Sequence, residues 1–200
     1  MSYLTPSQIE EVMLRFGTPR RLTGSFEITP PEFEMLRRSR KHERSHDVTL
    51  FIFREPDRRE FVGISKHMFA PGIFRAPSGA VHPGEDFVVG AEREATEETG
   101  MDVSLERFVL LIEAVFTCSG EEEPWTSYVF TALRSAGELS PIDTEEIKEA
   151  RWITFGELQG PIRAMMLASG AGLFRYRVFL HDASFEAIAG REVAQEEMTS

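Results

Sequence analysis

Cysteine is almost absent from this chain, in which Cys118 is the only one among 200 residues. One thiol cannot form an internal disulfide, and it cannot build a zinc site that needs several cysteines. Long apolar runs are also missing, since FVLLI at 108–112 is far too short to span a bilayer. The first residues, MSYLTPSQIEEV, lack the basic and apolar pattern of a signal peptide. These absences predict a protein without a membrane segment in a reducing, cytoplasmic setting.

Positive charge is scarce as well, with 22 Lys and Arg residues against 33 Asp and Glu residues and a formal net charge of −11. A general nucleic-acid-binding protein needs a basic surface, so the sequence argues against that class. Small anionic ligands are not excluded, because a local group of basic side chains can oppose the overall charge. Sixteen phenylalanines and a hydrophobic fraction of 42% supply the core of one domain.

Two helix starts mark the N-terminal part of the chain. Thr5-Pro6-Ser7-Gln8 combines a capping threonine, a proline at the first helical position and a glutamine that can reach back to the cap. Thr29-Pro30-Pro31-Glu32 repeats this pattern and predicts a second helix that ends near Arg40. The segment between them, RRLTGSFEI, predicts a short strand. We interpret residues 1–46 as an N-terminal extension of helices and a strand.

Residues 47–190 have the pattern of a mixed α/β domain. Strands are expected at 48–55, 60–66, 72–77 and 150–155 and in VSLERFVLLIEAVFTC and TSYVFTAL, and a helix is expected at 86–99. Strands and helices do not alternate as βαβ units, so we expect an α/β or α+β sandwich with a mixed sheet. The last segment, 191–200, is expected to be a flexible tail.

The stretch GAVHPGEDFVVGAEREATEETGM, residues 79–101, concentrates acidic side chains on the helix expected at 86–99. Glu94, Glu97 and Glu98 are three or four positions apart, so they lie on one face. Clustered carboxylates repel one another unless a cation lies among them. Oxygen ligands suit a hard divalent cation, so the sequence predicts a site for Mg²⁺, with Mn²⁺ as the alternative.

Other residues of this stretch can support the acidic face. An adjacent apolar stripe that can pack on a sheet contains Val88, Ala91 and Ala95. Arg93 lies four residues before Glu97, so it can pair with this glutamate or orient a neighbouring carboxylate. The loop before the helix is flanked by Gly79 and Gly84, which allow its backbone to come close to a metal.

The spacing of these residues resembles the signature of the Nudix hydrolases. That signature is Gly, five residues, Glu, seven residues, Arg-Glu, an apolar residue, any residue, Glu-Glu, any residue, Gly and an apolar residue. The matching positions are Gly79, Glu85, Arg93, Glu94, Ala95, Glu97, Glu98, Gly100 and Met101. A complete match with full spacing is far more specific than an isolated glycine motif. The order of elements over about 47–165, with Trp152 in the last strand, also resembles the Nudix α/β/α sandwich.

The resemblance implies hydrolysis of the pyrophosphate in a nucleoside diphosphate linked to another group. Water attacks phosphorus in line, while divalent ions neutralise phosphate charge and lower the pKa of the water. The implied roles are metal binding by Glu94, Glu97 and Glu98, a further ligand from the Gly79 carbonyl, orientation of the carboxylates by Arg93, and loop support or water-mediated metal binding by Glu85. Family frequency favours ADP-ribose or a nucleotide sugar as the substrate.

The general base has several candidates. Glu94 and Glu97 lie within the signature, and Glu145 and Glu146 precede the expected last strand. We favour Glu146, because its position six residues before Trp152 resembles a known family arrangement. The alternative is that DTEE at 143–146 caps a turn. The acidic loop SGEEEP at 119–124 can reach the metal or form an exposed hairpin.

Basic and aromatic side chains outside the signature have more than one interpretation each. The segment RRSRKHER at 37–44 can line the entry for pyrophosphate, serve a second copy in a homodimer, or be a solvated helix end. Arg54 and Arg75 can bind phosphate or form surface salt bridges. The remaining candidates are Trp125 and Phe130, which can stack on a base or pack in the core, and His82, which can be a ligand or face solvent.

Two other functions are compatible with a Nudix fold. The first is a non-catalytic module that binds a nucleotide or regulates through it. The second is an isomerase of the isopentenyl diphosphate type, which would need Cys118 to face the substrate, whereas a buried hydrophobic role is the alternative for this cysteine. For the hydrolase, we expect Glu98→Gln to lower the turnover rate by orders of magnitude and leave folding intact, because a metal ligand on the helix surface contributes little to the core.

Overall fold

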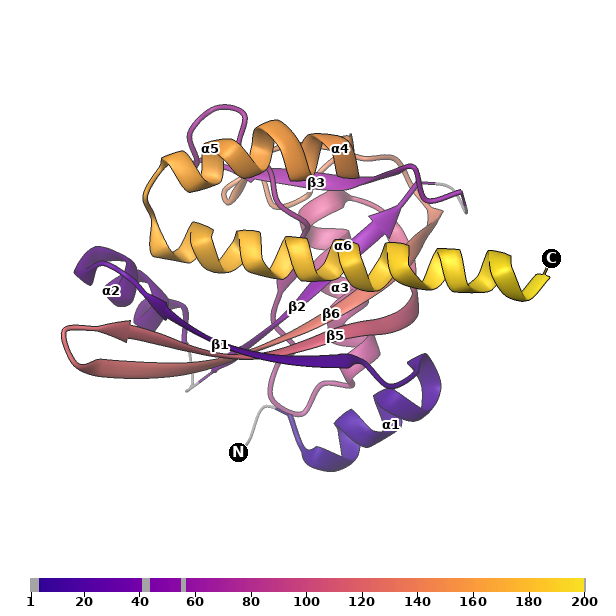
Figure 1. The fold of residues 1–200 in the computed structure, drawn as a ribbon, viewed down its shortest axis with the longest axis horizontal. Coiled ribbons are helices and arrows are strands. Elements are labelled where there is room, and N and C mark those ends of the chain that lie inside the picture. Colours follow the sequence, from indigo (N-terminus) through magenta and orange to yellow (C-terminus); the bar gives the residue numbers. More distant parts are fainter. Residues whose placement is uncertain (1–3, 41–43, 55–56, 200) are drawn as a thin grey trace.

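The computed structural model describes residues 4–40, 44–54 and 57–199, with side chains described as far as residue 190. Its central layer is a seven-stranded sheet in the order β1-β5-β6-β2-β3-β7, with β4 paired to β2 (Figure 1). The strands are β1 (Arg20–Glu27), β2 (His46–Phe53), β3 (Glu60–Lys66), β4 (Ser78–Gly79), β5 (Asp102–Cys118), β6 (Glu121–Ala136) and β7 (Ile147–Thr154). The pairs β1–β5 and β2–β6 are parallel and the others are antiparallel, so the sheet is mixed as expected.

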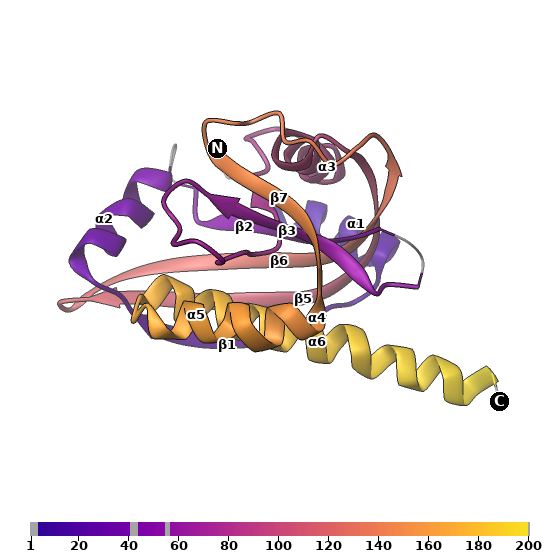
Figure 2. The same ribbon diagram turned by 90° about the horizontal axis from the view of Figure 1, so that it is seen from above.

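Helices cover both faces of this sheet (Figure 2). On one face lie α1 (Pro6–Phe16) and α3 (Phe87–Thr99), and on the other lie α4 (Phe155–Glu157), the π-helical turn η2 (Leu158–Ile162), α5 (Arg163–Ala168) and α6 (Gly172–Thr199). Each face has its own apolar core, because alternate residues of a strand point to opposite sides. The expected α/β/α sandwich with a mixed sheet is therefore confirmed.

The first 46 residues take part in the same sheet. Thr5 begins α1 with the expected capping box, in which the Thr5 N–H donates to Gln8 at 2.9 Å. A second box begins α2 (Pro30–Ser39), where the Thr29 N–H donates to Glu32 at 2.9 Å. Between the helices, β1 pairs with β5 over its full length. The N-terminal segment thus adds an edge strand to the sheet.

Two local expectations are corrected. Residues 72–77 do not form a strand, since their contacts with the sheet are an isolated bridge between Arg75 and Ile64 and one hydrogen bond from the Leu50 N–H to the Pro77 carbonyl. The segment SGEEEP is mostly part of β6, because Ser119 and Gly120 adopt left-handed backbone conformations that reverse the chain within two residues. Its Glu123 side chain is buried rather than exposed, and it pairs with α2.

The C-terminal helix α6 continues to Thr199, and its last turns project beyond the sheet (Figures 1 and 2). The expectation that 191–200 form a flexible tail stays a prediction. None of the helices in the described part of the chain is both long and apolar enough to cross a membrane.

Candidate active site

The acidic signature lies on α3 and on the loop that precedes it. The Asp86 carboxylate caps the helix by accepting hydrogen bonds from the N–H groups of Val88 at 2.9 Å and Val89 at 3.0 Å. At the other end, Gly100 adopts a left-handed conformation with φ of 76°. The apolar stripe Val88, Ala91 and Ala95 is buried against the sheet, as expected. Both ends and one face of α3 are therefore fixed.

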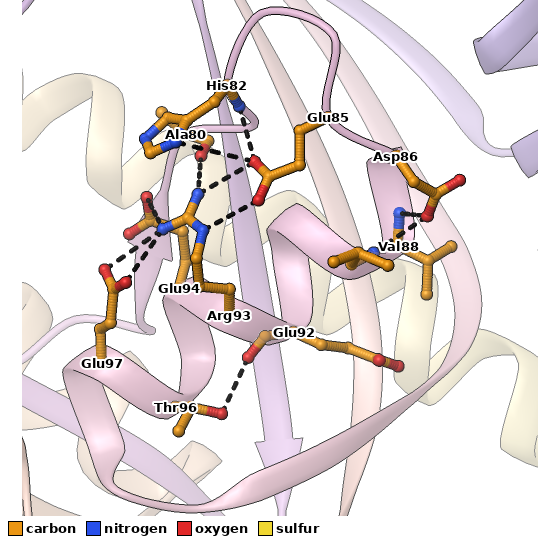
Figure 3. A network of polar contacts seen from close by, with 11 residues as sticks. Ala80, His82, Glu85, Asp86, Val88, Glu92, Arg93, Glu94, Thr96 and Glu97 are labelled. Atoms are coloured by element: carbon orange, nitrogen blue, oxygen red, sulfur yellow. Dashed lines mark hydrogen bonds and ion pairs between the residues drawn. The ribbon is translucent and has the colours of Figure 1, made fainter.

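Arg93 is the centre of a polar network that contains Glu85, Glu94 and Glu97 (Figure 3). Its guanidinium binds Glu85 through two hydrogen bonds of 2.9 and 3.1 Å, and it donates to the Ala80 carbonyl at 2.9 Å. The third nitrogen lies 3.1 Å from a Glu94 oxygen and 3.2 Å from a Glu97 oxygen. The Arg93 hydrogen bond lowers the pKa of Glu85, and the same contact raises the pKa of Arg93. We call this group the Arg93 network, and it offsets the repulsion among three carboxylates.

Glycine at position 79 allows Glu94 to approach the backbone. A Cβ atom on Gly79 would overlap the Glu94 carboxylate. The same is true at Gly90 on α3, where a Cβ would lie 2.6 Å from a Glu85 oxygen. Two glycines therefore give the signature carboxylates space that any other residue would fill.

Glu98 forms its contacts outside the Arg93 network and is buried, with 5% of its surface exposed. Its carboxylate accepts a 2.7 Å hydrogen bond from the Ser78 N–H, and its other oxygen lies 3.5 Å from Arg75 and 3.7 Å from Lys66. Burial raises the pKa of Glu98, against the opposite effect of these two cations. Our expectation of a ligand on the helix surface is wrong for Glu98, because the chain at Ser78 passes directly over it.

Lys66 connects Glu98 to a second acidic segment. It ends β3 at a β-bulge, and its ammonium group forms ion pairs with both Glu98 and Glu146. Burial and the nearby Arg75 guanidinium lower the pKa of Lys66 to about 7. The turn that carries Glu146 is capped by Asp143, whose carboxylate accepts the N–H groups of Glu145 and Glu146. The capping interpretation of this segment is thus correct, and Glu146 still reaches the signature through Lys66.

The carboxylates do not gather around one point. Within residues 4–40, 44–54 and 57–199, no three His, Cys, Asp or Glu side chains are arranged to hold a metal ion. Arg93 engages Glu94 and Glu97, while Lys66 and Arg75 face Glu98. The donors nevertheless fit a hard divalent cation chemically, because all are carboxylate oxygens beside a glycine that leaves room at the backbone. A bound ion would have to replace some of these internal ion pairs.

The remaining candidates are distributed between core and surface. Trp125 and Phe130 are buried, and the His82 side chain is 61% exposed. Arg54 forms an exposed pair with Glu60. Cys118 is buried in the core on the face opposite α3, which removes the isomerase interpretation.

The basic segment at 37–44 is not a free helix end in its described part. Arg37 pairs with Glu121 at 2.6 Å and with Glu123 at 2.8 Å, and Arg40 also pairs with Glu123. Residues 41–43 lie outside the described part of the chain. These pairs hold the tip of the long β5–β6 hairpin against α2, at one end of the sheet (Figure 1).

The sequence alone does not identify Lys66, and it leaves the role of Arg75 open. Lys66 belongs to a strand in which nothing but the residue type indicates a site. For Arg75 the sequence allows a phosphate ligand or a surface pair, whereas its side chain is 6% exposed and contacts Glu98. Both reach the signature only because β3 and the loop before β4 pass beside α3.

Comparison with known proteins decides the family. A family model described as NUDIX domain matches residues 44–172. The chain belongs to the Nudix family. Nudix hydrolase 8 of Arabidopsis thaliana is 27% identical over 116 residues, which are 56% of this chain and 31% of that protein. The NAD-capped RNA hydrolase NudC of Stutzerimonas stutzeri is 32% identical over 91 residues, which are 45% of this chain and 30% of that protein.

A solved structure supports the same fold. A UDP-X diphosphatase superposes with a TM-score of 0.53 at 15% identity, over 80% of this chain and 72% of that one. The matched regions span about a third of the length of the two relatives in sequence. These comparisons establish the family and the fold, and the residues of the site indicate the reaction.

Proposed function

We propose that the chain hydrolyses the pyrophosphate bond of a nucleoside diphosphate linked to another group, with Mg²⁺ or Mn²⁺ as cofactor. The main support for this proposal is that carboxylates and basic side chains lie close together in one site. Carboxylates of α3, above all Glu98, offer oxygen ligands for a divalent cation. Lys66 and Arg75 lie beside them and offer positive charge for phosphate.

Each signature residue has a role in this proposal. Glu94, Glu97 and Glu98 hold the metal with the Gly79 carbonyl. When bound, the metal supplies charge that stabilises phosphate oxygens and lowers the pKa of bound water. Arg93 keeps Glu94 and Glu97 oriented, and Glu85 fixes Arg93 to the loop. The Arg93 network therefore positions Glu94 and Glu97, while Glu98 lies outside this network and faces the reacting groups.

Glu146 is the proposed general base. Its carboxylate is exposed to solvent by 53%, and it is held beside Glu98 by Lys66. An ionised carboxylate in this place can accept a proton from the attacking water. Glu94 and Glu97 are the alternatives, and both accept hydrogen bonds from Arg93 just as Glu146 does from Lys66. Glu146 is preferred because its side chain is the most exposed of the three, at 53% against 19% for Glu94 and 47% for Glu97.

ADP-ribose and nucleotide sugars are the proposed substrates. Similar proteins carry names that specify a UDP-X diphosphatase and a hydrolase of NAD-capped RNA. These names share a nucleoside diphosphate as the group that is cut. A bound nucleotide without turnover is the second candidate for this site.

A substrate panel with and without Mg²⁺ tests the proposal. The panel contains ADP-ribose, UDP-sugars, NADH, dinucleoside polyphosphates and oxidised nucleoside triphosphates, and the products are separated by chromatography. Metal-dependent cleavage that is lost in Glu98→Gln supports the hydrolase. If no compound is cleaved while one of them raises the melting temperature, the chain is a nucleotide-binding module and the proposal is wrong.

A further inference from the structure

A second charged group lies next to Glu98 and includes the C-terminal helix. Lys66 from β3, Arg75 from the loop before β4 and Arg177 from α6 form what we call the basic cluster. Lys66 and Arg75 share the Glu98 carboxylate, and Arg75 also donates to the Ser78 hydroxyl at 2.8 Å. Ser78 pairs with Thr49 in the β2–β4 register, and Arg177 donates to Thr49, so the three cations lie near one another. Arg177 lies beyond residues 44–172, the range that the family model matches. The match to the family model therefore does not include Arg177.

Two polar contacts hold Arg177 against strand β2. Its guanidinium donates to the Thr49 hydroxyl at 3.2 Å and lies 3.4 Å from the Asp47 carboxylate. Asp47 has two other donors, the Trp125 indole N–H at 3.2 Å and the Ser127 hydroxyl. The Arg177 side chain keeps 15% of its surface exposed. Part of this guanidinium is thus bound to Thr49 and Asp47, and its exposed part can bind a ligand.

His181 adds an unsatisfied polar atom to the same helix. It lies four residues after Arg177, on the same face of α6, and is 2% exposed. Its Nε2 atom has no hydrogen-bond partner within the described residues. Burial lowers the pKa of His181 well below its ordinary value, and the nearby Arg177 and Arg75 add to this effect. The ring is neutral, so its nitrogen can donate to or accept from a ligand.

The charge balance of the cluster changes when Glu98 binds a metal. Without metal, Glu98 and Asp47 face the three cations. Once Glu98 is engaged by a divalent ion, Lys66 and Arg75 lose most of the charge that opposes them. Three cations then remain against Asp47, in a largely buried place where charge is poorly screened. Such a place favours an anion.

We propose that Arg177, with Arg75 and Lys66, binds the pyrophosphate group of the substrate, so that α6 forms part of the active site. The ligand identity rests on the proposed function. Arg177 and Arg75 present guanidinium groups that suit phosphate oxygens, and His181 offers the next hydrogen-bonding group. Arg177 is a substrate-binding residue here and takes no part in proton transfer.

Calorimetric binding of inorganic pyrophosphate and of ADP in Mg²⁺ tests this assignment in three variants of the full chain. In Arg177→Met, we expect the Kd to rise by roughly tenfold or more, because a charge-assisted contact is lost. Arg177→Lys should give an intermediate value. Arg175→Met is the matched control, since Arg175 lies two residues earlier on the exposed side of α6 and contacts only backbone carbonyls. Its Kd should match that of the unmodified chain.

Folding is controlled by circular dichroism and by a second variant. Asp47→Asn with Arg177→Met removes the acid that the single substitution would leave without its cation, and it should show the same weakened binding. An unchanged Kd in these variants, or no binding of either probe by the unmodified chain, overturns the assignment.

The hydrolysis panel separates this inference from the proposed function. Cleavage with an unchanged KM in Arg177→Met keeps the function and rejects the role of Arg177. Arg177-dependent binding of pyrophosphate without cleavage of any substrate keeps the anion site and rejects the function.

Discussion

The Arg93 network and the basic cluster both balance charge around α3, but the chain builds them differently. Every partner of Arg93 lies within 13 residues of it, whereas Arg177 and Asp47 are 130 residues apart. Their exposure differs as well, since the Arg93 side chain is 26% exposed and that of Arg75 is 6% exposed. Local spacing is enough to assemble the first group, while the second exists only in the folded sheet. Variants in each group should therefore fail in different ways.

The largest effect is expected from Glu98→Gln. The amide can still accept from the Ser78 N–H, but it lacks the charge that a metal needs. We expect kcat to fall by roughly 10³-fold, comparable with the loss of one strong electrostatic contact in an active site. The free energy of unfolding should fall as well, by up to about 3 kcal/mol, because the neutral amide leaves the buried Arg75 and Lys66 without the carboxylate that opposes them. Steady-state kinetics and urea unfolding measure the two quantities.

Glu92→Gln is the matched control for this variant. Glu92 lies on the same helix, at a position that the signature leaves free, and its side chain points away from the Arg93 network (Figure 3). Near-normal kinetics are expected for it. A kcat that stays near normal in Glu98→Gln would contradict the proposal that Glu98 binds the metal.

Gly79→Ala should have the next largest effect, and it acts on the Arg93 network. The new Cβ would overlap the Glu94 carboxylate, so this side chain must leave its place beside Arg93. We expect kcat/KM to fall by roughly 10- to 100-fold, because misplacing a ligand in an active site is costly. Gly190→Ala in α6 is the control, since its Cβ meets nothing within 4 Å. Equal activity of both variants would show that Glu94 does not need its present position.

The sequence predicts the helical part of the Arg93 network because helical periodicity determines which side chains of α3 meet, whereas the two hydrogen bonds from Arg93 to Glu85 in the preceding loop are not predicted. Glu97 lies one turn after Arg93 and shares a face with Glu94, and both carboxylates do pair with the guanidinium. The capping motifs predict the starts of α1 and α2 for the same reason, since caps depend on residues within one turn. The mixed sheet follows from the order of the elements.

Contacts that form only when the sheet assembles cannot be predicted from helical periodicity. Nothing at position 66 or 177 indicates a partner, because those contacts depend on strand order and on the path of α6. The strand expected at 72–77 is wrong for a related reason, since this apolar run is buried by packing although it makes only one sheet bridge. Burial of Glu98 also comes from the neighbouring chain at Ser78 and not from α3 itself.

Acidic pH should lower the free energy of unfolding, and part of this loss should come from His181 beside the basic cluster. Burial lowers the pKa of His181 below its ordinary value near 6.5, so the unfolded chain takes up a proton that the folded chain does not. Stability from this histidine is complete above pH 6.5 and is lost as the pH falls, by up to about 1.4 kcal/mol per pH unit. Urea unfolding at pH 7, 6 and 5 should show this decline.

His181→Phe isolates the contribution of this residue from other titrating groups. His46 also makes the fold less stable in acid, because burial lowers its pKa to about 4. The free energy of unfolding of the variant should therefore still fall with pH, but with a shallower slope. The difference between the chain and the variant should grow as pH falls. Parallel curves would mean that folding does not change the pKa of His181, and they would contradict its role as a buried neutral neighbour of Arg177.

The smallest effect is expected for a pair outside both groups, between Arg54 and Glu60. Their nitrogen and oxygen atoms are 3.0 Å apart, but the side chains are 50% and 40% exposed. Solvent screens such pairs, so Arg54→Gln should change the free energy of unfolding by at most about 0.5 kcal/mol and leave kcat/KM unaltered. Urea unfolding in low and high salt measures this. A larger loss that disappears in high salt would mean that exposed pairs matter here, and the contrast between exposed and buried charge drawn for Arg93 and Arg75 would fail with it.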